Sequence, residues 1–136
     1  MRLLAISDVY IPSAFMRQGL ESLEQFGVDV ETRPWEHPTL EELQEANLAI
    51  ETGGPEAVRL PADLLRDLED FHIVTVQFAP VGRALIEAAS QLKVIGVLRG
   101  GTENVDVQRA TERGVSVMNT PGRNARAVAE CAVGLI

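Results

Sequence analysis

Two adjacent glycines, Gly100 and Gly101, are the residues of this sequence best suited to hold a ligand. They follow an apolar run, residues 93–98, and precede a segment with the pattern of a helix. Adjacent glycines let the backbone turn sharply and come close to a ligand, and the free amides of such a loop can point at an anion. The expected guest is a carboxylate or a phosphate, although a turn that serves geometry alone would use the same residues.

A second loop with polar residues follows the next apolar run. Residues 115–118 form that run, and Asn119-Thr120-Pro121-Gly122 come directly after it. In doubly wound sheets, ligands bind beyond the carboxyl ends of the strands. Two loops from neighbouring strand ends are therefore expected to face one crevice.

The elements that must position these loops are short strands and helices in alternation. Apolar runs alternate with segments of helical period along the whole chain, which is typical of βαβ units that build a parallel sheet. The sequence therefore predicts an α/β fold, a parallel sheet with helices on both faces. The five predicted strands are residues 3–7, 28–32, 73–77, 93–98 and 115–118.

Helix start and stop signals lie between the predicted strands. Ser13 is expected to cap a first helix that ends at Gly27, and Thr39 to open a second through a capping box, with its end at Gly53. Within the second segment, residues 48–51 could instead form a strand. Two further helices are predicted after Pro61 and Pro80.

The last predicted helix, from Asn124, carries an apolar face to the end of the chain. One interpretation is a terminal helix that lies back on its own sheet, with Cys131 as a small core residue. The other is an interdomain helix whose continuation lies outside this chain. The apolar positions are Ala125, Val128, Ala129, Ala132, Val133 and Ile136.

Composition argues against several classes of protein. The formal charge of −8 repels polyanions and no basic stripe occurs, so nucleic acid is not an expected partner. No stretch approaches the roughly 20 apolar residues that span a bilayer, and the first residues lack the pattern of a secretory signal. We therefore expect no membrane association and a cytoplasmic location. The single cysteine, Cys131, allows no internal disulfide, and no metal site is expected.

The second half of the chain carries a series of motifs at fixed separations. They are Leu-Lys-Val-Ile-Gly from Leu92, Asn-Val-Asp from Asn104, Ala-Thr-Glu-Arg-Gly-Val-Ser-Val from Ala110, Asn-Thr-Pro-Gly from Asn119 and Ala-Val-Ala-Glu from Ala127. In this order and spacing they resemble the D-isomer-specific 2-hydroxyacid dehydrogenases, the family that includes phosphoglycerate dehydrogenase. The close match covers residues 79–136.

The resemblance implies a substrate-binding domain of flavodoxin-like topology over residues 1–122. Residues 123–136 would begin an interdomain helix that leads to a Rossmann domain, which binds NAD or NADP. The implied reaction moves a hydride between that cofactor and a D-2-hydroxy or 2-oxo acid in an enzyme that usually forms homodimers. The family's dinucleotide fingerprint, its Arg, its carboxylate and its His acid/base all lie beyond Ile136. No catalytic residue is therefore expected in this chain, which alone should be inactive.

The resemblance also assigns binding residues. The substrate loop falls on residues 99–102, so Gly100 and Gly101 would offer amides to the carboxylate of the small anionic acid. Asn124 falls where some members contact the substrate or the nicotinamide. Thr102 and Val128 are expected on the side of the cofactor.

Arg99 departs from the family, which commonly has a small residue at this position. Its guanidinium could hold a second anionic group of the substrate, which would favour a phosphorylated or sugar-derived acid. It could equally pair with Glu103 at the surface.

Three other titratable residues have side chains that could take part in chemistry, His37, His72 and Asp8. His37 and His72 are expected to be exposed imidazoles, since neither has a second ligand or carboxylate placed with it. Asp8, after the first strand, is expected to form an Asx turn, with a place on the outer wall of the cleft as the alternative.

A free-standing flavodoxin-like binding or signalling module is the alternative function. A phospho-receiver needs an Asp after the third strand and a Lys after the fifth, whereas these strands end in Gln77-Phe78 and Asn119-Thr120. A flavin module needs a hydroxyl-rich loop after the first strand, where this chain is acidic and apolar. An interaction domain without catalysis stays open.

Overall fold

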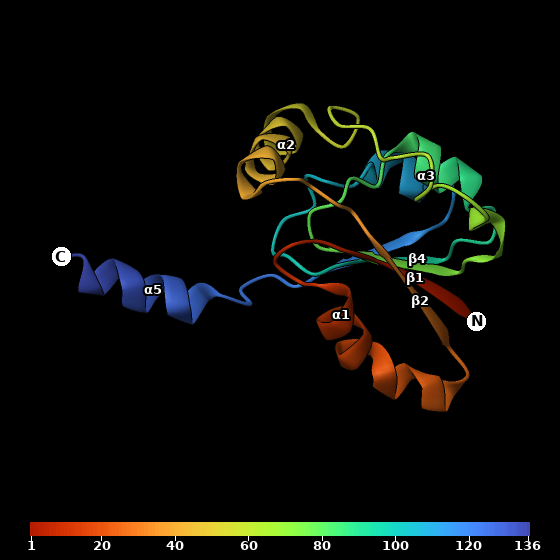
Figure 1. The fold of residues 1–136 in the computed structure, drawn as a ribbon, viewed down its shortest axis with the longest axis horizontal. Helices are drawn as coiled ribbons and strands as arrows, with labels where there is room; N and C mark the ends of the chain where they lie inside the picture. The colour runs from red at the N-terminus through yellow and green to blue at the C-terminus, as the bar shows by residue number, and fades with distance from the viewer.

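Five parallel strands form a single sheet in the computed structural model, which describes residues 1–136 (Figure 1). The strand order is β2-β1-β3-β4-β5, the order of flavodoxin-like sheets, and the predicted α/β class is confirmed. The chain leaves β1 for β2 on one side and then crosses to β3 on the other, so ligand loops gather beside this switch point. The strands are β1 (Arg2–Ser7), β2 (Asp29–Pro34), β3 (Ile73–Val76), β4 (Val94–Val97) and β5 (Ser116–Asn119).

Helices lie on both faces of the sheet, as predicted (Figure 1). One face carries α1 (Ser13–Leu20), which continues as the 3₁₀ helix η1 (Glu21–Phe26). The other face carries α2 (Leu40–Gly53) and α3 (Arg83–Ala88), and α4 (Val107–Glu112) contacts α3.

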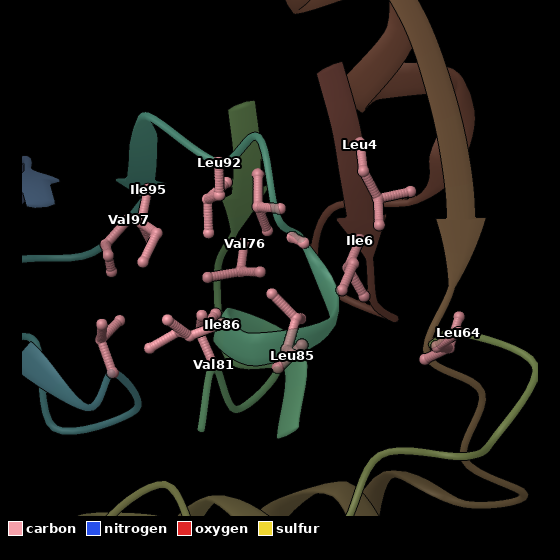
Figure 2. Close-up of a cluster of buried hydrophobic side chains, with 14 of the residues drawn as sticks. Leu4, Ile6, Leu64, Val76, Val81, Leu85, Ile86, Leu92, Ile95 and Val97 are labelled. Carbon is pink, nitrogen blue, oxygen red and sulfur yellow. The ribbon is translucent and has the colours of Figure 1, made fainter. Parts of the chain in front are cut away.

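The larger part of the core lies between the sheet and α3. Figure 2 shows Leu85 and Ile86 of α3 facing Val76 of β3, and all three are buried. Because successive residues of a strand point to opposite faces, the alternate positions pack against α1 on the other side. A smaller cluster there joins Met16 of α1 to strand residues Leu3, Ala5 and Val30 and to Val28. Burial on both faces explains why β1 and β3 are apolar runs without alternation, whereas the edge strands β2 and β5 carry exposed polar residues.

The helix signals are confirmed at Thr39 and Gly27 and are wrong at Ser13. The Thr39 hydroxyl accepts the amide of Glu42 at 3.2 Å, and Gly27 ends η1 in the left-handed conformation, with φ 74°. Pro12 occupies the cap position of α1, while the Ser13 hydroxyl lies 2.7 Å from that of Ser7 and caps no helix. Residues 48–51 belong to α2 and form no strand.

The helix predicted after Pro61 is replaced by turns and a short 3₁₀ helix, η2 (Leu68–Asp70). Arg33 of β2 supplies the reason, because its guanidinium donates to the carbonyls of Leu64 at 3.2 Å and Arg66 at 2.6 Å. Those carbonyls are the acceptors that a helix would use. Asp67, with φ 51°, also interrupts the helical conformation.

The last helix, α5 (Ala125–Gly134), stands away from the sheet (Figure 1). None of its residues is buried, so the interpretation in which it lies back on its own sheet is wrong. Cys131 is exposed as a consequence, and its prediction as a core residue is also wrong. Of all the helices, none combines the length and apolar character needed to cross a membrane.

Candidate functional site

The loop that follows β4, residues 98–103 and here called the glycine loop, presents free backbone amides. No hydrogen bond in the structure uses the amide of Gly100, Gly101 or Thr102 as its donor. Gly100 is exposed and the other two are partly exposed, so a ligand can reach them. Amides without a partner at a strand end are the groups that bind a carboxylate.

Two carbonyls of the glycine loop, those of Arg99 and Gly100, are held by the loop after β5. The Asn119 side-chain amide donates to the Gly100 carbonyl at 2.6 Å. Thr120 donates its backbone amide and its hydroxyl to the Arg99 carbonyl, at 3.0 and 3.2 Å. The two loops therefore lie together at one sheet edge, and their contacts hold the carbonyls of Arg99 and Gly100. That the loops face one crevice stays a prediction.

Asn104 fixes the other end of the glycine loop. It is fully buried, and its side-chain amide donates to the carbonyls of Gln77 at 3.2 Å and Ala79 at 3.0 Å. Its own carbonyl accepts the Val81 amide at 2.7 Å. The glycine loop is thus tied to the segment after β3. Sequence reasoning treated Asn104 only as part of a motif, and its position between a glycine loop and a helix was the available signal.

An added side chain would meet different surroundings at the two glycines. A Cβ on Gly101 would collide with the Glu103 carboxylate, whereas a Cβ on Gly100 would meet nothing closer than 3.9 Å. Neither glycine has a positive φ. The turn itself therefore does not require glycine at position 100, where a bare backbone leaves the amide accessible.

Arg99 lies against the glycine loop and is largely covered, with 14% of its side chain exposed. Its Nη2 donates to Glu51 Oε1 of α2 at 2.9 Å and lies 3.5 Å from Glu103 Oε2. The guanidinium carbon is 5.2 Å from the centre of the Phe78 ring, a cation–π arrangement. The predicted pairing with Glu103 is present, and the shorter pairing with Glu51 was not foreseen.

The turn after β1 extends the same edge. The Asp8 Oδ1 atom accepts the amides of Tyr10 at 2.9 Å and Ile11 at 3.0 Å, which confirms the predicted Asx turn. Burial raises the pKa of Asp8, while hydrogen bonds from backbone amides and the nearby charge of His37 lower it in part. The Tyr10 ring packs on Phe78 at 5.4 Å, so this turn neighbours the ring that covers Arg99.

Both histidines are more enclosed than predicted. The His37 ring packs edge-on against buried Trp35 at 4.4 Å, and its Nε2 is buried without a partner. His72 Nδ1 accepts the backbone amide of Arg2 at 3.3 Å. The expectation of freely solvated imidazoles is wrong for both, because each ring lies against a neighbouring strand or its end.

Comparison with known proteins places the chain. The sequence-family model of the D-isomer specific 2-hydroxyacid dehydrogenase catalytic domain matches residues 17–133. This chain belongs to that family. The resemblance carried by the motifs from Leu92 onward is therefore confirmed.

Relatives in the D-isomer specific 2-hydroxyacid dehydrogenase family match the chain over 75 residues. The hydroxypyruvate reductase of Thermotoga maritima is 40% identical over that stretch, which is 54% of this chain and 24% of the relative. The D-3-phosphoglycerate dehydrogenase of Methanocaldococcus jannaschii is also 40% identical, over 54% of this chain and 14% of its own length. These matches span about a quarter or less of the relatives' length.

Solved structures share the fold. The NAD⁺-bound 3-phosphoglycerate dehydrogenase of Entamoeba histolytica has a TM-score of 0.65 at 21% identity, over 98% of this chain and 37% of that one. The NAD-dependent formate dehydrogenase of Staphylococcus aureus, solved with NAD, has a TM-score of 0.64 at 21% identity, over 98% and 35%. At such identities the likeness shows the fold alone.

The residues that the family resemblance assigned fall into two groups in space. Gly100, Gly101 and Thr102 lie together on the glycine loop beside Arg99. Asn124 and Val128 lie at the start of α5 and are exposed, and no hydrogen bond joins Asn124 to the glycine loop. No Gly-x-Gly-x-x-Gly fingerprint follows any strand of this chain.

Proposed function

We propose that residues 1–122 are the substrate-binding domain of an NAD(P)-dependent D-2-hydroxyacid dehydrogenase. Residues 123–136 would begin the helix that leads to its Rossmann domain. The observation that carries the proposal is the set of three free amides on the glycine loop, at the carboxyl edge of a sheet of this family. An acid with a carboxylate beside its reacting carbon is the substrate such amides fit.

The part of the reaction that this chain supplies is orientation. The amides of Gly100 and Gly101 would donate to the substrate carboxylate, since they have no partner within the protein while the carbonyls of Arg99 and Gly100 are already held by the loop after β5. Hydrogen bonds to a charged group are each worth about 1.5–3 kcal/mol, enough to fix one end of a small acid. With the carboxylate fixed, the C2–H bond can face the cofactor in one orientation only.

The reaction itself would use groups outside the described loops. As the alcohol is oxidised, the C2–H bond breaks with its electron pair, the hydroxyl proton leaves to a base, and a C2=O bond forms. NAD or NADP accepts that hydride when bound, and its dinucleotide site would come from a Rossmann domain. Thr102 and Val128 would face the cofactor, and Asn124 would contact the substrate or the nicotinamide. The whole enzyme would act as a homodimer.

The names of two relatives indicate two kinds of substrate. Hydroxypyruvate reductase and D-3-phosphoglycerate dehydrogenase differ in whether a phosphate is present. We propose a small D-2-hydroxy or 2-oxo acid for this chain on that basis.

The direct test is activity of the protein encoded by the complete reading frame. We expect NADH- or NADPH-dependent reduction of a 2-oxo acid such as hydroxypyruvate. Replacing the acid by its neutral amide removes the carboxylate and should lower kcat/KM by about a hundredfold or more. Equal kcat/KM for acid and amide would contradict the assigned role of the glycine loop, and no turnover of any 2-oxo acid would contradict the proposed enzyme.

A further inference from the structure

The one cation beside the glycine loop is outnumbered by carboxylates. Arg99 lies between Glu51, at 2.9 Å, and Glu103, at 3.5 Å, and these three side chains are here called the Arg99 rim. One positive and two negative charges leave the rim with a formal charge of −1. Both carboxylates are about half exposed, 46% and 48%, whereas Arg99 itself is 14% exposed. A ligand at the rim therefore meets carboxylate oxygens before it meets the guanidinium.

The donors of Arg99 are also poorly placed for a second anion. Nη2 is engaged by Glu51 Oε1, and the Phe78 ring covers one face of the guanidinium. A phosphate is recognised by a guanidinium that presents a free, planar edge with two donors. A phosphate that reached Nε or Nη1, which make no hydrogen bond in the structure, would still lie beside the carboxylates of Glu51 and Glu103. Two like charges within several ångströms of a phosphate repel it.

Hydroxyl groups fit the same rim without this conflict. A hydroxyl donates to a carboxylate oxygen and accepts from a guanidinium N–H, so the alternation of Glu51, Arg99 and Glu103 offers both kinds of partner. The carboxylates are partly hydrated, and a hydroxyl replaces a water molecule with an equivalent hydrogen bond. Neighbouring hydroxyls on one carbon chain can use two carboxylates at once.

On the basis of the proposed function, we infer that the Arg99 rim selects D-2-hydroxy acids whose remaining carbons carry uncharged hydroxyls and rejects those with a second anionic group. The amides of Gly100 and Gly101 hold the carboxylate at one end of such an acid. The Arg99 rim then contacts the hydroxylated end. The substrate class is a short sugar acid without phosphate.

The test compares two ligands that differ only in a phosphate, D-erythronate and D-erythronate 4-phosphate. Each is titrated into the ¹⁵N-labelled chain at matched ionic strength, because salt screens exposed charges. The amide signals of Gly100 and Gly101 report the dissociation constant. We expect D-erythronate to bind with a Kd at least about tenfold lower than its 4-phosphate.

The variant Glu51→Gln/Glu103→Gln removes the two charges with little change of shape. It should tighten binding of the 4-phosphate by about tenfold and should not tighten binding of D-erythronate. The matched control is Glu87→Gln/Glu112→Gln. It removes the two carboxylates that contact Arg109, at 2.7 and 3.0 Å, and changes the net charge equally. The ratio of the two dissociation constants should stay that of the parent.

Four outcomes would overturn the inference. It is overturned if the 4-phosphate binds the parent as tightly as D-erythronate, or if the Glu51→Gln/Glu103→Gln variant leaves the ratio unchanged. An equal shift in the control variant would also overturn it, because net charge would then explain the result. If neither ligand moves the amides of Gly100 and Gly101, the proposed function fails as well, and this outcome is distinct from a reversed preference.

Discussion

The Asn119 side chain donates a 2.6 Å hydrogen bond to the Gly100 carbonyl, and this bond joins the two loops that follow β4 and β5. Asn119 holds this carbonyl, while the amides of Gly100, Gly101 and Thr102 donate to no group of the protein. The two loops are sequential strand ends of one parallel sheet, and β4 pairs with β5 through Val97 and Asn119. Sheet register thus determines which residue can reach the glycine loop.

Substitution Asn119→Ala should weaken ligand binding more than folding. The lost hydrogen bond is exposed and contributes about 1 kcal/mol at most to the free energy of unfolding. The glycine loop, however, loses one of the contacts that fix its orientation. We expect the Kd for a 2-hydroxy acid to rise by about fivefold and amide hydrogen exchange at residues 100–102 to accelerate. Gln108→Ala, an exposed amide on α4, serves as the control. Unchanged Kd and exchange in Asn119→Ala would contradict this role.

Asn104→Ala should instead be costly for the fold. The substitution leaves the buried carbonyls of Gln77 and Ala79 without their donor. Each unsatisfied buried group costs about 1–3 kcal/mol, so the free energy of unfolding should fall by about 2–4 kcal/mol. Urea denaturation measures it. A loss below about 0.5 kcal/mol, the size expected for a surface change, would show that these bonds are not required.

The two glycines of the glycine loop should respond differently to alanine. At position 101 the new methyl collides with the Glu103 carboxylate and pushes it from Arg99, whereas at position 100 the methyl fits. The Glu103 carboxylate is the half-exposed end of a flexible side chain and can move aside, so we expect Gly101→Ala to lose the Glu103–Arg99 ion pair and, like Gly100→Ala, to stay within about 1 kcal/mol of the parent. Thermal unfolding measures the stability, and the carboxyl ¹³C signal of Glu103 reports the loss of the ion pair; a signal that moves equally in both variants would refute the steric difference.

Much of the fold follows from local pattern, and the loop contacts do not. The alternation of short β-branched runs with helical segments locates all five strands. Burial on both faces explains the continuous apolar residues of β1 and β3, whereas the edge strands β2 and β5 are partly exposed. The pairing of Arg99 with Glu51 joins residues 48 positions apart, and only the packing of α2 beside the glycine loop brings them together. The local pattern after Pro61 also predicts a helix that does not form, because Arg33 of β2 donates hydrogen bonds to the carbonyls that the helix would use as acceptors.

Asp8 should titrate above the ordinary value of 3.8 for an aspartate, because its carboxyl is buried. A folded-state pKa above the unfolded value means that the folded chain binds this proton more tightly. The contribution of Asp8 to stability is therefore fully present below pH 3.8 and is lost as the pH rises through the folded pKa. Carboxyl ¹³C shifts across the acid range measure the pKa directly.

The positive charge of His37 lowers the pKa of Asp8 in part, so removing it gives a check on this assignment. The variant His37→Gln should move the Asp8 pKa further upward. The reading of a buried carboxyl at the end of β1 is wrong if Asp8 in the parent titrates at or below 3.8, or if His37→Gln moves its pKa downward.

Amide NMR tests most directly whether the free amides of the glycine loop bind a carboxylate. The ¹⁵N-labelled chain is titrated with D-glycerate, and with glycerol as the neutral counterpart of similar size. We predict that D-glycerate shifts the amide signals of Gly100, Gly101 and Thr102 in a saturable manner, while glycerol does not. Signals of these three residues that stay in place with D-glycerate, or that move equally with glycerol, would contradict the central claim.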